Sequence, residues 1–302
     1  MELIIILMQN NLSIMKKTLV LLAIALTAAA CQKNVEKKIN NDLLPIRLSV
    51  GLETKATDTA YEEGDQIGVF VSYSAALEAT GAYVANRKFT YSSGAWVAES
   101  DIYWKDKTTS ANFYVYYPYA GVSSAAALNF NVKSDQSAIA NYKASDFLWG
   151  KKASVSPTED VVALSTRHIM SNIIIVLQPG EGFTADEFAS ATKSVTLGNV
   201  KTGADVNLGT GEVTVKGDAG SITPYFGGEN WRAVVVPQSV SDQAALVSVV
   251  VNGVSYSLAR SFTFRSGIQH RMNVAVNKLT NGLTVSIEDW TPDDQEYNEI
   301  AR

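Results

Sequence analysis

Cysteine, histidine and excess basic charge are scarce in this chain of 302 residues. It contains one cysteine and two histidines, and its formal net charge is −5. A single cysteine cannot form an intrachain disulfide, so stability has to come from packing and backbone pairing. The mildly acidic balance gives no electrostatic reason to bind nucleic acid, and we expect no nucleic-acid partner.

Catalytic motifs are also missing. The sequence has no glycine-rich phosphate loop, serine elbow or metal-binding motif. Neither His168 nor His270 has cysteines or clustered carboxylates at metal-ligand spacing, so we predict no metal and no cofactor. We interpret His168, at the entry of an apolar strand, as structural. Asp65 and Asp101 are typical of turns, although acid/base pairs formed in space stay open. The sequence predicts that the chain is not an enzyme.

The longest apolar run near the start of the chain has the flanks of an export signal. Lys16 and Lys17 precede an apolar run over residues 19–26, and the small residues 27–30 lead to Cys31. The run is shorter than the ~20 residues needed to span a bilayer. A positive start, an apolar middle and small residues at the cut are typical of a secretory signal peptide.

We therefore predict a signal peptide over residues 1–30, cut between Ala30 and Cys31, with Met15 as the true start of the chain. A cysteine directly after small residues resembles a bacterial lipobox, in which the thiol is lipidated. Ala28 stands where such boxes usually carry leucine. The alternative is an ordinary signal peptide followed by an incidental cysteine. Several acyl chains on Cys31 would make membrane attachment effectively permanent.

A polar stretch over residues 31–42 follows and is predicted to be a flexible, lipidated tether. Residues 1–30 carry one acidic and two basic side chains, so their removal changes the net charge from −5 to −6. It leaves 272 residues, which is enough for two domains of common size.

Strand patterns fill the rest of the chain. Residues 44–50 place Leu44, Ile46, Leu48 and Val50 on one side, with a period of two. Further strands are expected over residues 66–72, 88–91, 95–97, 111–117, 169–178, 194–197, 232–236, 246–251, 254–259, 272–276 and 283–287. A short helix is expected within 184–193, and hairpin turns at 92–94 and 252–253. The pattern predicts an all-β fold of two β-sandwich domains in tandem, 43–179 and 180–302, the second ending in an acidic tail.

Eight segments, taken in order, resemble the fimbrillins of Bacteroidetes, in particular the major-fimbrium-like (Mfa-like) branch. They are EGDQIGVF at 63–70, NFYVYYPY at 112–119, DQS at 135–137, YKASDFLWG at 142–150, RHIMSNI at 167–173, VPQ at 236–238, FRSG at 264–267 and IEDW at 287–290. Each is weak alone, and the ordered set is fairly specific. The resemblance implies two transthyretin-like β-sandwiches and a structural subunit of a cell-surface fimbria (pilus). It also implies a palmitate-bearing lipoprotein precursor carried to the outer membrane, and then an extracellular fimbrium with a part in cell adhesion.

The resemblance further implies how the subunit assembles with other fimbrial subunits. An arginine- or lysine-specific protease removes the lipid with the first strand, and a donor strand of the next subunit fills the groove. Residues 44–50 have the alternation of a removable strand. Lys55, in the polar loop after it, is the favoured cut, and Arg47 lies inside the strand and is expected to be protected until the strand frays. The alternative for both is a solvated charge without processing.

The C-terminus departs from the pattern of a donor strand. After Trp290 the chain carries Pro292 and four acidic residues, which suit a solvated tail. Leu283, Val285 and Ile287 do alternate, so the donor could lie before Trp290. Otherwise the subunit belongs at an end of the fibre, as a tip or an anchor.

The main alternative function is a surface lipoprotein that binds host or bacterial glycans. Trp96, Trp104, Trp149 and Tyr119 could stack on sugars if they line a surface. The competing interpretation is that aromatic residues in strands belong to the core.

Overall fold

The computed structural model describes residues 43–52 and 61–290 of the chain. Strands dominate this part, and its helices are the short α2 (Ile139–Lys143) and α3 (Ala185–Ser190). The prediction of an all-β fold is therefore confirmed. These elements belong to one compact unit that begins at Leu44. Within the described ranges, no helix is both long and apolar enough to span a bilayer.

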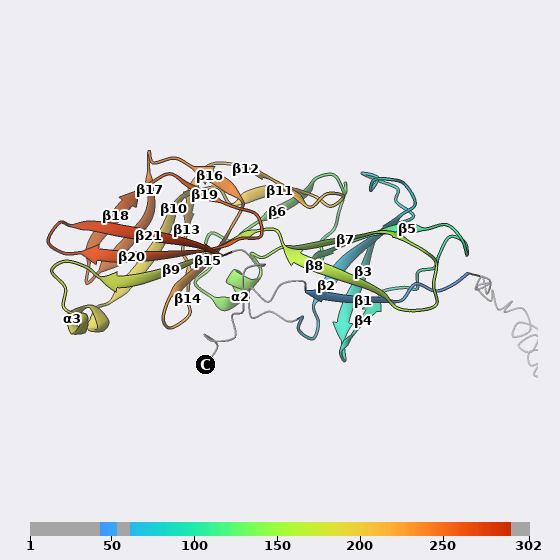
Figure 1. The fold of residues 1–302 in the computed structure, drawn as a ribbon, viewed down its shortest axis with the longest axis horizontal. Coiled ribbons are helices and arrows are strands. Elements are labelled where there is room, and N and C mark those ends of the chain that lie inside the picture. Colours follow the sequence, from blue (N-terminus) through green and yellow to red (C-terminus); the bar gives the residue numbers. More distant parts are fainter. Residues whose placement is uncertain (1–42, 53–60, 291–302) are drawn as a thin grey trace, which may run out of the picture. The chain divides into compact units, whose positions relative to one another are not determined.

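A seven-stranded sheet is formed by the first part of the chain, blue to green in Figure 1. The strand order is β1-β8-β7-β5-β2-β3-β4. The strands are β1 (Leu48–Leu52), β2 (Gln66–Ser72), β3 (Val84–Ser92), β4 (Ala95–Ala98), β5 (Ala111–Tyr117), β7 (Leu148–Val155) and β8 (Val162–His168). β1 pairs with β8 in parallel, from Leu48 opposite Val162 to Leu52 opposite Thr166, and the other neighbours are antiparallel. The first strand thus forms one edge of this sheet.

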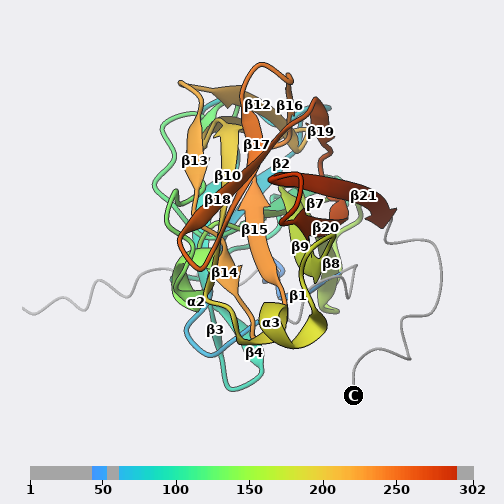
Figure 2. The ribbon, with the colours of Figure 1, turned by 90° about the vertical axis from the view of Figure 1, so that its left-hand side faces the viewer.

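Four smaller sheets complete the fold (Figures 1 and 2). Their orders are β14-β15-β9-β20-β21, β13-β10-β17-β18, β12-β11-β6 and β16-β19. The strands are β6 (Leu128–Asn131), β9 (Ser171–Pro179), β10 (Lys193–Val200), β11 (Gly203–Asn207), β12 (Glu212–Lys216), β13 (Gly220–Ile222), β14 (Tyr225–Phe226), β15 (Trp231–Val235), β16 (Gln238–Val240), β17 (Ala245–Val251), β18 (Val254–Ala259), β19 (Phe262–Phe264), β20 (Gln269–Asn277) and β21 (Gly282–Trp290). β9 and β20 pair in parallel at the centre of the five-stranded sheet.

Two hydrophobic clusters form the interior. The first core contains Ile46, Leu48, Val50, Ile67, Val69, Val71, Val84, Phe89, Trp96, Ile102, Trp104, Ala111, Phe113, Val115, Val162 and Leu164. The main core unites the other sheets with one face of the seven-stranded sheet. β2 and β5 run between the two cores, because Phe70, Tyr114 and Tyr116 point into the main core while their neighbours point into the first. This explains why the apolar pattern of 66–72 is continuous rather than alternating.

The main core draws residues from both sides of the predicted domain boundary at 179. Phe147 and Trp149 lie before it, and Trp231 and Val274 lie after it. β6 likewise pairs with β11 across that boundary. The tandem transthyretin-like division at 179/180 stays a prediction.

Local sequence signals account for several of the elements. Pro118 follows the last residue of β5, as predicted, since proline cannot donate to a ladder. In the β17–β18 hairpin Asn252 and Gly253 both have positive φ, 46° and 83°, which a type I′ turn requires. α3 begins after Thr184, whose hydroxyl accepts the Glu187 N–H while the Glu187 carboxylate accepts the Thr184 N–H, a capping box.

Candidate functional site

The first strand has one buried and one exposed side. Ile46, Leu48 and Val50 are 6%, 7% and 8% exposed, and the intervening Arg47 and Ser49 are exposed. The alternation predicted for residues 44–50 is therefore confirmed for these positions. The named strand β1 begins later than predicted, at Leu48, because its ladder with β8 begins there.

The groove that holds this strand has aromatic and aliphatic walls. Trp104 and Phe113 are fully buried in it, and Phe89 is almost so. Trp104 and Phe113 meet edge to face with ring centroids 5.5 Å apart. Such an interior would expose a large apolar surface if the strand left, which monomeric proteins rarely tolerate.

Backbone hydrogen bonds hold the segment before β1 on two sides. The Ile46 N–H donates to the Ile102 carbonyl, and the Leu44 carbonyl accepts the Trp104 N–H, both at 2.9 Å. On the other side the Arg47 carbonyl accepts the Val162 N–H, also at 2.9 Å. The segment is thus bonded along both flanks, as a strand filling a slot would be.

Two side chains fasten β1 from neighbouring strands. The Trp96 indole N–H, on the opposite edge strand β4, donates to the Val50 carbonyl at 3.2 Å. The Thr166 hydroxyl on β8 donates to the Gly51 carbonyl at 3.1 Å. Thr166 is also within 2.7 Å of the Tyr61 hydroxyl. The first strand therefore links the two edges of the seven-stranded sheet.

The free energy of filling the groove is large for one strand. Burial of an aliphatic side chain contributes about 1.5–3 kcal/mol, so the three buried side chains contribute roughly 5–9 kcal/mol. The whole stability of a domain is usually about 5–15 kcal/mol. An empty groove would consequently leave the first core marginal, and another strand would have to take its place.

The residues predicted for lipidation and processing have different positions. Arg47 directly precedes β1 with its side chain exposed and its carbonyl hydrogen-bonded. Ala30, Cys31 and Lys55 lie outside the described residues. The signal peptide, the lipid anchor and both processing sites stay predictions.

The segment predicted as a donor within 283–287 forms part of β21. β21 pairs with β20 along its full length, as the edge of the five-stranded sheet. Leu283, Val285 and Ile287 are partly buried against the main core. In this chain the alternating apolar residues thus complete the chain's own sheet.

The tryptophans considered for sugar stacking are core residues. Trp96, Trp104 and Trp149 are 9%, 0% and 8% exposed. Their indole N–H groups donate to the backbone carbonyls of Val50, Thr158 and Leu208. They do not line a surface, so the stacking role considered for them was wrong; Tyr119 is half-buried beneath the Lys88 ammonium, 5.8 Å from its ring centre.

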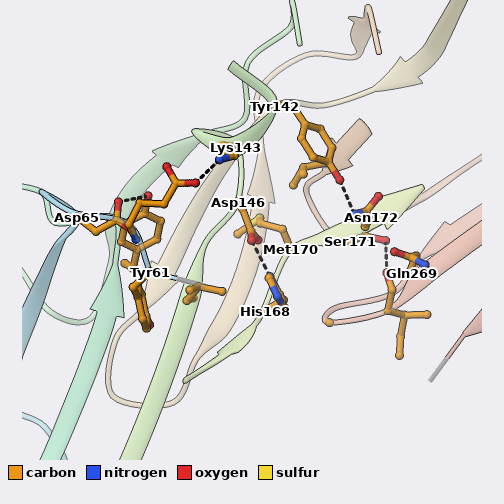
Figure 3. Close-up of a pocket in the computed structure, with 16 residues that line it drawn as sticks. Tyr61, Asp65, Tyr142, Lys143, Asp146, His168, Met170, Ser171, Asn172 and Gln269 are labelled. Carbon is orange, nitrogen blue, oxygen red and sulfur yellow. Dashed lines mark hydrogen bonds and ion pairs between the residues drawn. The ribbon is translucent and has the colours of Figure 1, made fainter. Parts of the chain in front are cut away.

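A pocket lies where the end of β8 leads into β9; we call it the junction pocket (Figure 3). It is lined by Tyr61, Glu62, Asp65, Tyr117, Tyr142, Lys143, Asp146, Leu148, His168, Met170, Ser171, Asn172, Val234, Gly267, Ile268 and Gln269. The cavity has a volume of about 80 Å³. The sequence signals for strands did not predict this pocket, because its walls come from loops and strand ends that are far apart in the chain.

His168 sits in this pocket beside a carboxylate. Its Nδ1 is 2.6 Å from Asp146 Oδ2 (Figure 3). Asp146 Oδ1 accepts the Phe147 N–H at 2.9 Å. Burial by itself lowers the pKa of His168, but the hydrogen bond and the charge of Asp146 outweigh it and raise that pKa above its ordinary value. Burial raises the pKa of the nearby Tyr61 hydroxyl to about 12, which keeps it a neutral donor or acceptor.

The second histidine is part of the core. His270 is 1% exposed, its Nε2 accepts the Arg265 N–H at 3.2 Å, and the Phe262 ring meets it edge to face. In the described ranges no three histidine, cysteine, aspartate or glutamate side chains are grouped so that they could hold a metal ion.

Residues 54–290 match the model of a protein family described as fimbrillin-like. This match covers most of the described residues, including the main core and all of the first core except Ile46, Leu48 and Val50. The chain belongs to the fimbrillin-like family. The predicted relation to the fimbrillins of Bacteroidetes is thus confirmed.

Relatives of this fimbrillin-like chain come from Bacteroides. It is 25% identical over 263 residues to "Putative fimbrium subunit Fim1C" of Bacteroides uniformis, covering 80% of this chain and 83% of the relative. Its fold is similar to a crystal structure of "a putative cell adhesion protein" from Bacteroides uniformis, with TM-score 0.64, 22% identity, and 82% and 97% of the two chains covered. One from Bacteroides ovatus with the same description has TM-score 0.62, 19% identity, and 83% and 99% covered.

Proposed function

We propose that this fimbrillin-like chain is a structural subunit of a cell-surface fimbria that assembles by strand exchange. It is exported as a lipoprotein precursor through Cys31, held at the outer membrane, and cut so that its first strand leaves. A donor strand from a neighbouring subunit then fills the groove. The chain works as a building block and not as an enzyme.

The observation that carries this proposal is the way the first strand is bound in the fold. Residues 46–50 fill an apolar slot from a sheet edge, a few residues ahead of Lys55 in the sequence. An incoming strand would find unpaired carbonyls and N–H groups on both flanks, together with apolar sites for alternate side chains. The bound strand can leave without breaking the other strand pairings, because it is the first strand of the described fold and lies at the edge of its sheet.

The C-terminal region favours a place at one end of the fibre. The alternating residues 283–287 are already used within the chain's own sheet. The remaining tail, with Pro292 and four acidic residues, lacks the apolar alternation of a groove-filling strand, and Pro292 cannot donate to a ladder. We infer a subunit that accepts a strand and does not give one.

Strand exchange is tested by replacing Lys55 with alanine. We expect wild-type protein from cell surfaces to run in SDS without heating within ladders that contain other fimbrial subunits, and K55A to run as a monomer. K107A, which removes an exposed lysine between β4 and β5, is the matched control and should form ladders as the wild type does. Ladders from K55A of the same length and amount as those of the wild type would refute processing at this lysine.

Lipidation is tested separately by intact mass of the surface protein. The precursor should begin at Cys31 and carry the added mass of acyl chains, and C31A should lack that mass and the membrane attachment. The processed subunit should begin near residue 56. An unmodified cysteine on membrane-attached protein would exclude the lipid anchor.

A further inference from the structure

We propose that the junction pocket binds one neutral sugar ring, at the end of a glycan. The argument rests on the shape, the paired charges and one unpaired amide of this pocket. No residue of β1 itself lines the pocket, although Tyr61 and Tyr117 line it and also pack against the first core. Sugar binding is therefore tested separately from strand exchange.

The size of the cavity fits one ring and not a longer chain. A cavity needs about 10–15 Å³ to hold one water molecule, so a cavity of about 80 Å³ admits roughly five to eight waters. A single hexose displaces a similar number. Further sugars of a glycan would extend into solvent past the rim, where Lys143 and Glu62 have exposed side chains.

The walls offer the apolar and aromatic surface that the C–H faces of a sugar require. Tyr61, Tyr117 and Tyr142 line the pocket together with Met170 and Ile268. The Tyr142 ring is fixed by stacking on Tyr225, with centroids 5.8 Å apart and 28° between the planes. Mostly apolar walls with a few directed polar groups are the usual composition of a small-molecule site.

Five acidic or basic side chains line the pocket; four of them form two pairs, and the fifth, Asp65, accepts hydrogen bonds. Lys143 forms an ion pair with Glu62, and His168 forms one with Asp146 (Figure 3). The carboxylate of Asp65 accepts the Tyr117 hydroxyl at 3.1 Å and the Glu62 N–H at 2.7 Å. A charged ligand would have to break one of these pairs, whereas a neutral hydroxylated ligand leaves them intact.

Asn172 supplies the polar contact that such a ligand would complete. Its Nδ2 donates to the Tyr142 hydroxyl at 2.8 Å, and its Oδ1 is buried without a partner (Figure 3). Turning the amide over only exchanges the two atoms, so one of them stays unpaired either way. Buried polar groups normally have partners. Asn172 lines the pocket, and a turn of its side chain toward the cavity would let a sugar hydroxyl, which both donates and accepts, pair with the free amide atom.

The experiment titrates ¹⁵N-labelled protein of residues 31–302 with six free neutral sugars: glucose, galactose, mannose, fucose, N-acetylglucosamine and N-acetylgalactosamine. We expect at least one to bind with a dissociation constant on the order of 1 mM and to shift the side-chain amide signal of Asn172. N172L should weaken that binding at least tenfold. The matched control N273L, on β20 outside the pocket, should bind as the wild type does.

I268W is a second test should N172L fail to fold, because it fills the cavity from a half-exposed turn. It should abolish binding while leaving SDS ladders unchanged, which separates this proposal from strand exchange. The proposal is overturned if none of the six sugars binds at 20 mM or if N172L binds as tightly as the wild type. It is also overturned if sialic acid, or a peptide of residues 291–302, shifts the pocket signals while the neutral sugars do not.

Discussion

Single buried polar residues tie the loops of this fold to its strands, and Gln136 is the clearest case. It is fully buried, and its amide forms a two-way bond with β15: Nε2 donates to the Val234 carbonyl and Oε1 accepts the Val234 N–H, both at 2.8 Å. Nε2 also donates to the Lys133 carbonyl at 3.0 Å. The side chain therefore replaces a missing strand at the edge of β15.

We expect Q136A to lower the free energy of unfolding by about 2–4 kcal/mol, since it leaves an N–H and carbonyls buried without partners. Urea unfolding followed by tryptophan fluorescence measures the change. Q178A removes the same side chain from an exposed position on β9 and should change the stability by less than about 0.5 kcal/mol. Equal effects of the two variants would mean that the Gln136 bonds add nothing.

His168 gives the stability a predictable dependence on pH. Because its pKa is higher in the folded chain than the ordinary 6.5, it contributes stability that is fully present below pH 6.5 and lost as the pH rises through the folded pKa. We expect the wild type to lose stability as the pH rises above 6.5. D146N removes the partner and should flatten that slope. An equal slope in D146N would assign the pH dependence to other groups.

At the scale of elements, β1 differs from every other strand of the seven-stranded sheet because it pairs in parallel and lies at the edge. We expect L48A to destabilise the chain by about 2–4 kcal/mol and to speed ladder formation, since the strand that must leave is held less strongly. S49A changes the exposed side of the same strand and should leave both quantities unchanged. Slower or unchanged ladder formation in L48A would show that departure of β1 does not limit assembly.

The elements that could be predicted from sequence are those with a local signal. Alternation marked residues 46–50, a continuous apolar run marked β2 and β9, and glycine turns marked the β3–β4 and β17–β18 hairpins. The pairing of β6 with β11 and of β1 with β8 was not predictable. Each pair joins segments that lie far apart in the sequence and are not connected by a hairpin turn. The Leu208–Gly211 turn before β12 was also missed, since its flanking strands β11 and β12 have only five residues each and mix apolar with polar residues.

The candidate sites likewise divide into one with a local sequence signal and one without. The buried side of the first strand follows from its period of two, so the groove was predictable in outline. The junction pocket was not, because Tyr61, His168 and Asn172 meet only after β8 has crossed to β9. No spacing in the sequence relates a loop tyrosine to an amide more than a hundred residues later.

At the scale of the whole described fold, the two cores share β2 and β5, yet only the first core contains residues of β1. Loss of β1 would therefore open one face of these shared strands, and the main core would stay packed against the other. This is the mechanical condition for strand exchange, because a subunit has to keep most of its structure while it waits for a donor. The division into two cores also predicts that loss of β1 loosens the first core and leaves the main core packed.

We therefore expect a chain that begins at residue 56 to lose hydrogen-exchange protection in β8, especially at residues 162–166 opposite the missing strand, while β9 and β20 keep theirs. A peptide of residues 43–52 added in trans should restore the protection of β8, because it offers the same ladder and the same three apolar side chains. A peptide with aspartate at positions 48 and 50 should not. If β9 and β20 lose protection together with β8, the two cores unfold as one unit, and a subunit without its first strand could not wait for a donor in folded form.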